Sequence, residues 1–292
     1  MLALLCALLG QANAADAGTV LRRQMVLGQG RTPDIAYSIY LPDGHAAPSA
    51  RFPVVYLLHG YGASDDEWLA AARLPETLDR MIADGEIAPL IAVMPDAAKS
   101  WYVDSPRSGG PGDYETAIVD NLVRAIDGRY QTRAIADSRA IAGVSMGGFG
   151  ALRLAFKHPD RFRAVAALSP GLFKPEGLSW RHGPALERRA NRERWYADIF
   201  GTPFDLGLYI AQSPFAYVAQ FAEATPRPDI LLVVGDDDGL GSYDGTVEMF
   251  LELRAAGLKP ELRVADGGHD WRFWRAMTPE LFRFLDLCWP QP

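Results

Sequence analysis

Hydrophobic positions follow two different patterns along the chain. The stretches 19–28 and 34–42 are rich in strand-forming residues, and their length and proximity predict an antiparallel pair of strands at a sheet edge. Further along, short continuous apolar runs alternate with longer amphipathic segments, and these runs occupy residues 53–59, 90–95, 139–144, 164–169, 229–235 and 261–266. Continuous apolar strands separated by helices are typical of a parallel sheet covered on both faces. We therefore predict the α/β class, with a mostly parallel eight-stranded sheet flanked by helices on both faces.

The region 170–228 lies between the sixth and seventh of the eight predicted strands and breaks the alternation of strands and helices. It is rich in proline and contains the charged cluster ALERRANRERW. Two interpretations stand, a helical connection and a cap over a binding site, since insertions at this end of a sheet often shape pockets. The chain shows no internal repeat or low-complexity linker, so we expect residues 15–292 to form a single domain with a cap-like insertion around 170–228.

Length, composition and charge narrow the class of protein. The chain has 292 residues, of which 49% are apolar, and can fill a substantial core. The formal net charge of −7 and the isoelectric point near 5.3 argue against nucleic acid or an anionic membrane surface as the main partner. These numbers indicate a folded protein and leave a small-molecule or carbohydrate-linked substrate to be argued from the motifs.

The first fourteen residues, MLALLCALLGQANA, combine a short apolar run with an A-x-A pattern at 12–14. This pattern predicts a signal peptide over residues 1–14, cleaved before Ala15, and the run is too short to span a bilayer. The alternative is a buried N-terminal helix. Cleavage would leave Cys288 as the single cysteine, so the exported chain would fold without an internal disulfide. We predict a secreted or periplasmic protein.

The stretch IAGVSMGGFG places Ser145 where a predicted buried strand meets a helix. G-x-S-x-G at such a junction is typical of a nucleophile elbow, a strained turn that presents the serine at the carboxyl ends of the strands. Gly143 and Gly147 would relieve the crowding in that turn. The alternative is that Ser145 only caps the following helix, so its chemical partners have to decide.

A serine nucleophile needs a base, and the base needs an acid that orients it. Of the five histidines, only His269 lies both after the strand that ends in the acidic run and in a glycine-rich loop, GGHDW. We predict that it is the general base. The run VVGDDDGLG and the helix after it leave the acid open among Asp236, Asp237, Asp238 and Asp244. A calcium loop that began at Asp236 would place Leu240 and Val247 at ligand positions, so no metal site is predicted.

The segment LLHGYGASDDEW follows the third predicted strand. An H-G-x-G turn at this point exposes backbone N–H groups toward the nucleophile. We predict that the N–H groups of Tyr61 and Met146 form an oxyanion hole. His59 is interpreted as a structural residue under this loop rather than as a second base.

Four segments, LLHGYGASDDEW, GVSMGGFGALRLAFKHPDRF, GDDDGL and GGHDW, resemble in this order and spacing the esterase D-like branch of the α/β-hydrolases. That branch includes feruloyl and acetylxylan esterases, S-formylglutathione hydrolases, enterochelin esterases and mycolyltransferases. The resemblance covers roughly residues 30–286 and implies the α/β-hydrolase fold.

The resemblance also implies roles for residues that the pattern leaves open. In feruloyl-esterase relatives the triad acid is the fourth residue of a G-x-x-D segment, which implies Asp238, with Asp237 as the second choice. The segment SWYVDSP resembles a loop beside the active site, so Trp101 and Tyr102 are implied as substrate-binding residues. Trp271, beside the predicted base, is a third candidate, and aromatic packing is the alternative for all three.

Together these residues predict a secreted serine esterase that hydrolyses carboxylic esters through an acyl-enzyme and needs no cofactor. The resemblance favours feruloyl or acetyl esters of plant cell-wall carbohydrate as substrates. Acyl transfer to a sugar or alcohol uses the same triad and is one alternative, and S-formylglutathione hydrolysis, which the leader disfavours, is another. A non-catalytic binding protein on a hydrolase scaffold would have no reason to keep nucleophile, acid, base and oxyanion loop together.

Overall fold

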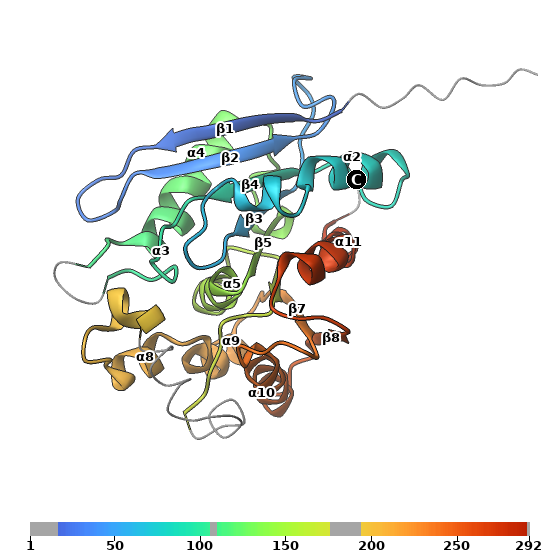
Figure 1. Ribbon diagram of the computed structural model, residues 1–292. Coiled ribbons are helices and arrows are strands. Elements are labelled where there is room, and N and C mark those ends of the chain that lie inside the picture. Colours follow the sequence, from blue (N-terminus) through green and yellow to red (C-terminus); the bar gives the residue numbers. More distant parts are fainter. Residues whose placement is uncertain (1–16, 106–109, 176–193, 291–292) are drawn as a thin grey trace, which may run out of the picture.

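The computed structural model describes residues 17–105, 110–175 and 194–290, and the leader predicted over 1–14 lies outside them. Eight strands form one sheet in the spatial order β1-β2-β4-β3-β5-β6-β7-β8 (Figure 1). In chain order the strands are β1 (Thr19–Val26), β2 (Ile35–Leu41), β3 (Val54–Leu58), β4 (Ile91–Pro95), β5 (Arg139–Val144), β6 (Ala164–Leu168), β7 (Asp229–Gly235) and β8 (Glu261–Ala265).

The sheet is mostly parallel. β1 pairs antiparallel with β2 at one edge, and β2 pairs antiparallel with β4. The remaining neighbours, from β4 through β3 and β5 to β8, are all parallel. The predicted edge pair and the predicted parallel series are therefore both confirmed. Because parallel strands end at the same edge of a sheet, the loops after β3, β5, β7 and β8 can meet there, as ligand-binding loops do in open α/β sheets.

Helices lie on both faces of this sheet (Figure 1). The described helices are α1 (Glu67–Ala70), α2 (Leu74–Ala83), α3 (Tyr114–Thr116), the π-helical η1 (Ala117–Leu122), α4 (Val123–Arg129), the 3₁₀ turn η2 (Ala136–Ser138), α5 (Met146–Lys157), α8 (Leu206–Gln212), the 3₁₀ turn η3 (Pro214–Tyr217), α9 (Val218–Glu223), α10 (Ser242–Ala255) and α11 (Trp271–Cys288).

Alternate side chains of the central strands enter two separate cores, because successive residues of a strand point to opposite faces. In β3, Tyr56 is buried in the core that contains η1, α4, α5 and α10, whereas its neighbour Leu57 is buried against α2 and α11. The same alternation separates Leu232 from Val233 in β7. Burial on both faces explains why these strands read as continuous apolar runs in the sequence.

The described parts of the region 170–228 pack onto the main core. Phe173 stacks on Tyr209 of α8 with ring centroids 4.0 Å apart, and Phe221 of α9 stacks on Phe156 of α5 at 4.5 Å. Most of the charged cluster of this region lies at 185–193, outside the described residues. The described segments therefore extend the core that lies over α5.

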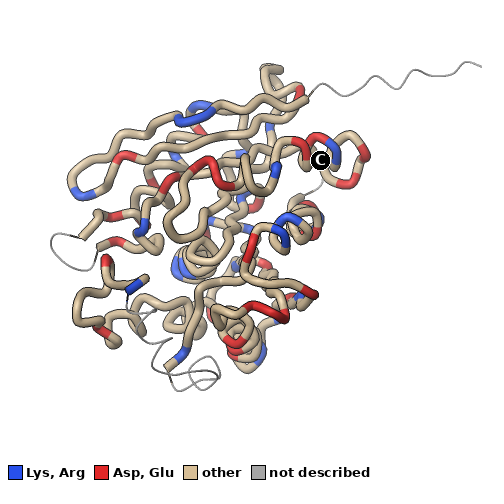
Figure 2. The backbone as a smooth tube through the Cα atoms, viewed as in Figure 1, with Lys and Arg blue, Asp and Glu red and all other residues tan. Residues whose placement is uncertain are grey.

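Charge is dispersed along the described backbone, where Lys and Arg occur in short separate segments between acidic ones (Figure 2). Among the helices that the structure describes, none is both long enough and apolar enough to cross a lipid bilayer.

Candidate active site

Ser145 occupies a strained turn between β5 and α5. Its backbone has φ +55° and ψ −116°, a conformation that side chains rarely adopt. A Cβ atom on Gly143 would lie 2.3 Å from the carbonyl carbon and oxygen of Gly147, and one on Gly147 would lie 2.2 Å from the carbonyl oxygen of Leu58. Both positions therefore require glycine. The Ser145 side chain makes no capping hydrogen bond to α5, so the capping interpretation has no contact to support it.

His269 and Asp238 continue from Ser145 in one chain of hydrogen bonds. The Ser145 Oγ lies 2.9 Å from His269 Nε2, and His269 Nδ1 lies 2.8 Å from Asp238 Oδ2. The Asp238 side chain is fully buried, and its other oxygen accepts from the N–H of Leu240. A carboxylate can only accept, so Nδ1 carries the proton and Nε2 is free to accept one from the serine.

The carboxylate that meets His269 is thus that of Asp238, whereas Asp236 and Asp237 are exposed at the strand end. Asp244 lies in the first turn of α10. The Ser242 hydroxyl oxygen at the start of α10 is also 3.3 Å from His269 Nδ1 and is buried. Ser242 was missed by the sequence reasoning, because a serine directly after a glycine loop carries no distinguishing signal.

The loop after β3 lies beside Ser145. A Cβ atom on Gly60 would lie 3.8 Å from the Cβ of Ser145. Within the described chain no acceptor is found for the N–H of Tyr61, the next residue. Met146 is the first residue of α5, where N–H groups have no acceptor within their own helix. Both predicted oxyanion donors are therefore backbone N–H groups near the serine, since Met146 directly follows it and Tyr61 directly follows Gly60.

His59 lies under this loop and is 1% exposed. Its Nε2 accepts from the N–H of Ala97 at 2.9 Å, so its Nδ1 donates to the carbonyl oxygen of Gly60 at 2.7 Å. Burial lowers the pKa of His59 and outweighs the opposing effect of Asp96, whose carboxylate lies 3.7 Å away. The neutral ring uses both nitrogens to hold neighbouring backbone groups, in agreement with the structural role expected of His59.

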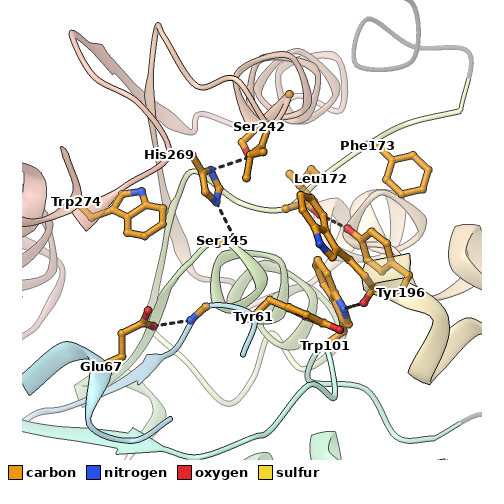
Figure 3. A pocket seen from close by; sticks show the side chains of 15 residues that line it. Tyr61, Glu67, Trp101, Ser145, Leu172, Phe173, Tyr196, Ser242, His269 and Trp274 are labelled. Atoms are coloured by element: carbon orange, nitrogen blue, oxygen red, sulfur yellow. Dashed lines mark hydrogen bonds between the residues drawn. The ribbon is translucent and has the colours of Figure 1, made fainter. Parts of the chain in front are cut away.

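A cavity of about 300 Å³ opens over Ser145 and His269 (Figure 3). Most of its wall is apolar, and the apolar side chains that line it are Tyr61, Trp101, Leu172, Phe173, Trp195, Tyr196, Leu240 and Trp274. Trp101 and Tyr196 stack with ring centroids 3.9 Å apart on the side opposite His269. Polar groups are few and lie near the serine, as is usual for a small-molecule site.

The three aromatic residues implied as substrate-binding residues have different positions. Trp101 lines the cavity, whereas Tyr102 is fully buried and donates its hydroxyl proton to the carbonyl oxygen of His59 at 3.0 Å. Trp271 is also absent from the cavity wall and donates from Nε1 to Glu67 Oε1 at 3.0 Å. For Tyr102 and Trp271 the packing alternative therefore describes the structure, which corrects the expectation that they line the pocket.

Glu67 is a cavity residue that the sequence reasoning did not single out. Its Oε2 accepts from the N–H of Gly60 at 2.7 Å, and its Oε1 accepts from the Trp271 indole. Glu67 is the first residue of the short helix α1, within the segment LLHGYGASDDEW. Acidic residues are common in the first turn of a helix, so nothing in the sequence pointed to this role.

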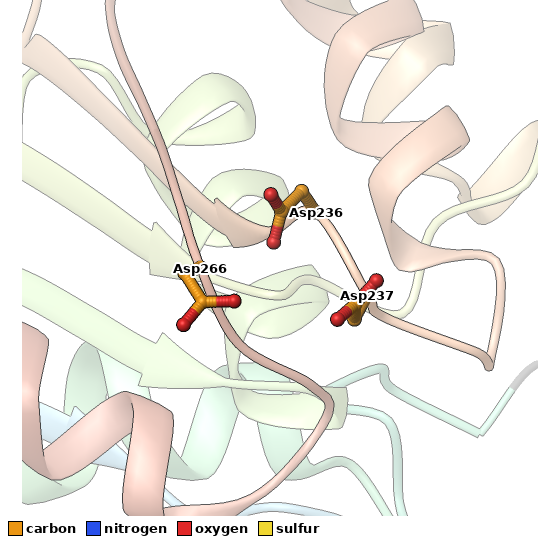
Figure 4. Close-up of side chains that lie close together, drawn as sticks. All are labelled: Asp236, Asp237 and Asp266. Carbon is orange, nitrogen blue, oxygen red and sulfur yellow. The ribbon is translucent and has the colours of Figure 1, made fainter.

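In the described part of the chain, three acidic side chains come close enough to share a cation: Asp236, Asp237 and Asp266 (Figure 4). All three are exposed, and Asp236 also accepts from the N–H of Gly267. Solvated acidic clusters of this kind are common on protein surfaces, so the group does not by itself indicate a metal centre.

The fold, with a serine elbow at the carboxyl edge of a mostly parallel sheet, is that of an α/β-hydrolase. The Esterase family model ("Putative esterase") matches residues 31–285, so the chain belongs to this family. The resemblance to esterase D-like enzymes is thereby confirmed.

Individual relatives agree with this family. Esterase Rv1288 of Mycobacterium tuberculosis (strain H37Rv) is 30% identical over 280 residues, which cover 86% of this chain and 54% of that protein. The endo-1,4-beta-xylanase/feruloyl esterase of Xylanibacter ruminicola is 32% identical over 146 residues, covering 48% of this chain and 20% of that protein. A solved structure of a ferulic acid esterase superposes with a TM-score of 0.75 at 26% identity and covers 94% of this chain and 99% of that one. The chain thus spans about half the length of the first of these relatives and a fifth of the second.

Proposed function

We propose that this chain is a serine esterase that cleaves carboxylic esters through an acyl-enzyme formed on Ser145. The observation that carries the proposal is the hydrogen-bonded chain from Ser145 through His269 to the buried Asp238, at the base of an apolar cavity. Membership of the esterase family supports the same reaction class. The mechanism needs no metal or organic cofactor.

In the proposed first step, His269 Nε2 takes the hydroxyl proton of Ser145 while the serine oxygen attacks the ester carbonyl. The carbonyl oxygen becomes an oxyanion that accepts from the N–H groups of Tyr61 and Met146. The imidazolium then protonates the departing alkoxide, and the acyl group stays on the serine. Asp238 holds the ring in the reactive tautomer and stabilises its positive charge.

In the second step, His269 takes a proton from water, which attacks the acyl-enzyme, and the free acid leaves as the serine regains its proton. The same acyl-enzyme would yield a transferred ester if a sugar or alcohol took the place of water. Product analysis with and without an added sugar acceptor separates the two reactions, and we expect free acid in both samples.

The test of the reaction class is hydrolysis of nitrophenyl acetate by the wild type and by Ser145→Ala. We expect the variant to lose on the order of 10⁴-fold or more in kcat. Ser49→Ala, on an exposed loop, is the matched control and should keep wild-type rates. Equal activity in wild type and Ser145→Ala would refute the proposed nucleophile.

For the substrate, we propose feruloyl or acetyl esters of plant cell-wall carbohydrate. The stacked Trp101 and Tyr196 offer a flat aromatic wall for the acyl group. The structural likeness to a ferulic acid esterase supports the aromatic acyl group. Rates on methyl ferulate, acetylated xylan, nitrophenyl esters of increasing length and S-formylglutathione should rank methyl ferulate or acetylated xylan first. A clear preference for S-formylglutathione would overturn this assignment.

We also propose that the protein is exported, because residues 1–14 carry the composition of a cleavable leader. N-terminal sequencing of the protein from culture medium or periplasm should begin at Ala15. An N-terminus that retains the leader would contradict export.

A further inference from the structure

Two consecutive peptide groups lead to the Tyr61 N–H, and three of their four polar atoms are held by side chains. The first peptide group joins His59 to Gly60. Its carbonyl oxygen accepts from the Tyr102 hydroxyl at 3.0 Å, and its N–H donates to Glu67 Oε2 at 2.7 Å. The second joins Gly60 to Tyr61, and its carbonyl oxygen accepts from His59 Nδ1 at 2.7 Å. The fourth atom, the Tyr61 N–H, is the one for which the described residues supply no acceptor.

Glu67 also joins this loop to the segment that carries His269. Its Oε1 accepts from Trp271, which begins α11 two residues after the histidine. The Trp271 ring packs edge-on against Trp274 at 5.3 Å, and Trp274 packs edge-on against His269 at 4.9 Å. One carboxylate therefore connects the oxyanion loop, near residue 60, with the base loop near residue 270.

The carboxylate lies close to the reacting serine, and among the described residues no hydrogen bond joins the two side chains. A Cβ atom on Gly60 would lie 3.6 and 3.7 Å from the two Glu67 oxygens and 3.8 Å from the Ser145 Cβ. Both oxygens accept from N–H groups that belong to the scaffold. Glu67 is thus placed to hold the site rather than to exchange protons with the substrate (Figure 3).

We propose that Glu67 is a positioning residue of the esterase site, which fixes the oxyanion loop and the base loop relative to each other. This inference rests on the proposed function, because the loop matters only if an oxyanion forms there. Hydrogen bonds from N–H groups to a carboxylate are about twice as strong as neutral ones and hold the peptide plane accordingly. The Tyr61 N–H then keeps its direction before the substrate arrives.

The size of the effect follows from what an oxyanion donor contributes. Deleting one such donor costs about 10²- to 10³-fold in kcat. Loss of Glu67 would misdirect the donor rather than delete it, so Glu67→Ala should lower kcat by about 10- to 100-fold. The KM should change by less than about threefold, because the oxyanion exists only after attack has begun.

Glu67→Gln provides a sharper test because an amide has one acceptor oxygen instead of two. Whichever way the amide turns, its NH₂ group faces an N–H donor, either that of Gly60 or that of Trp271. We expect a kcat loss of about tenfold. Adding Trp271→Phe removes the indole donor and lets the amide oxygen face Gly60, so the double variant should be more active than Glu67→Gln alone. Trp271→Phe by itself should lose less than about threefold.

The measurements are kcat and KM on nitrophenyl acetate, the melting temperature, and the inhibition constant of an aryl trifluoromethyl ketone. That ketone adds to an active-site serine and forms an oxyanion, so its inhibition constant should rise in proportion to the loss of kcat/KM. Glu76→Gln on the exposed face of α2 is the matched control and should match the wild type in every measurement.

The outcomes separate the two proposals. A wild type that neither hydrolyses esters nor depends on Ser145 would remove the proposed function and this inference together. An active wild type with wild-type kcat in Glu67→Ala, or a double variant no more active than Glu67→Gln, would overturn the positioning role alone. The same holds if kcat falls while inhibition by the ketone stays unchanged. If Glu67→Ala fails to fold, Glu67→Gln and its double variant decide.

Discussion

The turn at Ser145 and the loop at Tyr61 lie side by side at one edge of the sheet, but they are fixed in different ways. The turn is held by its own backbone. The Ser145 N–H donates to Leu168 in β6, its carbonyl oxygen accepts from Gly171, and the flanking glycines leave no room for a Cβ atom. Backbone hydrogen bonds and backbone crowding together therefore determine the direction of the serine.

The loop at Tyr61 is held instead by side chains from several segments. His59, Glu67 and Tyr102 each hold one atom of the two peptide groups that precede the Tyr61 N–H. None of these contacts arises from backbone crowding. A substitution in the turn displaces the nucleophile itself, whereas a substitution around the loop misdirects only one oxyanion donor and should lower activity less.

The largest effect is expected in the hydrogen-bond chain from the turn to the buried acid. Asp238→Asn places an amide beside His269 Nδ1 and favours the wrong tautomer, so kcat should fall by about 10⁴-fold. Asp237→Asn is the matched control, because that side chain is exposed and should keep kcat within twofold. Steady-state rates on nitrophenyl acetate measure both. The reverse ranking would make Asp237 the acid.

The second-largest loss of kcat is expected when a methyl group is added within the turn. Gly147→Ala forces a Cβ atom to within 2.2 Å of the Leu58 carbonyl oxygen, so the turn must move. We expect about 100-fold lower kcat and about 1–3 kcal/mol lower stability in urea unfolding.

Gly128→Ala serves as the control for this change. Gly128 lies in α4, where a Cβ atom would meet nothing within 4 Å. Alanine there should stabilise the helix by up to about 1 kcal/mol and leave kcat unchanged. A Gly147→Ala variant that matches this control would show that crowding does not determine the turn.

A smaller effect is expected from the loop. Tyr102→Phe leaves the buried His59 carbonyl oxygen without its donor, which should cost about 1–3 kcal/mol of stability and about tenfold in kcat. Tyr40→Phe removes another buried tyrosine hydroxyl, which donates to Asp79 at 2.7 Å on the side of α2. Both variants should lose stability in thermal unfolding, but only Tyr102→Phe should lose kcat. Equal kcat values in Tyr102→Phe and Tyr40→Phe would show that the hydrogen bond from Tyr102 to the loop does not affect catalysis.

The turn and the loop also differ in how far the sequence could predict them. The turn is local, so the spacing of Gly143, Ser145 and Gly147 was enough to predict its geometry. The edge pair, the parallel strands and the helices on both faces also followed from periodicity, whereas the spatial order of the strands did not. The choice of Asp238 needed a family resemblance, since the residue pattern left four acids open.

The loop depends on contacts between distant segments, and no periodicity reports them. Glu67 and Trp271 are 204 positions apart in the sequence. Trp101 and Tyr102 both have positive φ values, +53° and +58°, so the chain turns sharply between one ring in the cavity and the next in the core. A motif that names both residues cannot say which ring faces the substrate.

The smallest expected effect is on the pH dependence of stability, and it comes from His59 under the loop. Burial lowers the pKa of His59 in the folded chain, and the Ala97 N–H occupies the nitrogen that would take the proton. The unfolded chain binds that proton near pH 6.5. Stability from this neutral ring is therefore fully present above about pH 6.5 and is lost as the pH falls below it, by up to about 1.4 kcal/mol per pH unit.

His59→Gln removes the titrating ring and should flatten this dependence. The difference in unfolding free energy between wild type and His59→Gln should shrink as urea titrations move from pH 7 to pH 5. Carboxyl groups titrate mostly below this window and should affect both proteins alike. Parallel stability curves would mean that His59 takes up a proton as readily in the folded chain as in the unfolded chain, although Nε2 must then give up the hydrogen bond from Ala97. The Ala97 hydrogen bond would then contribute little to holding the loop, which would depend on Glu67 and Tyr102 instead.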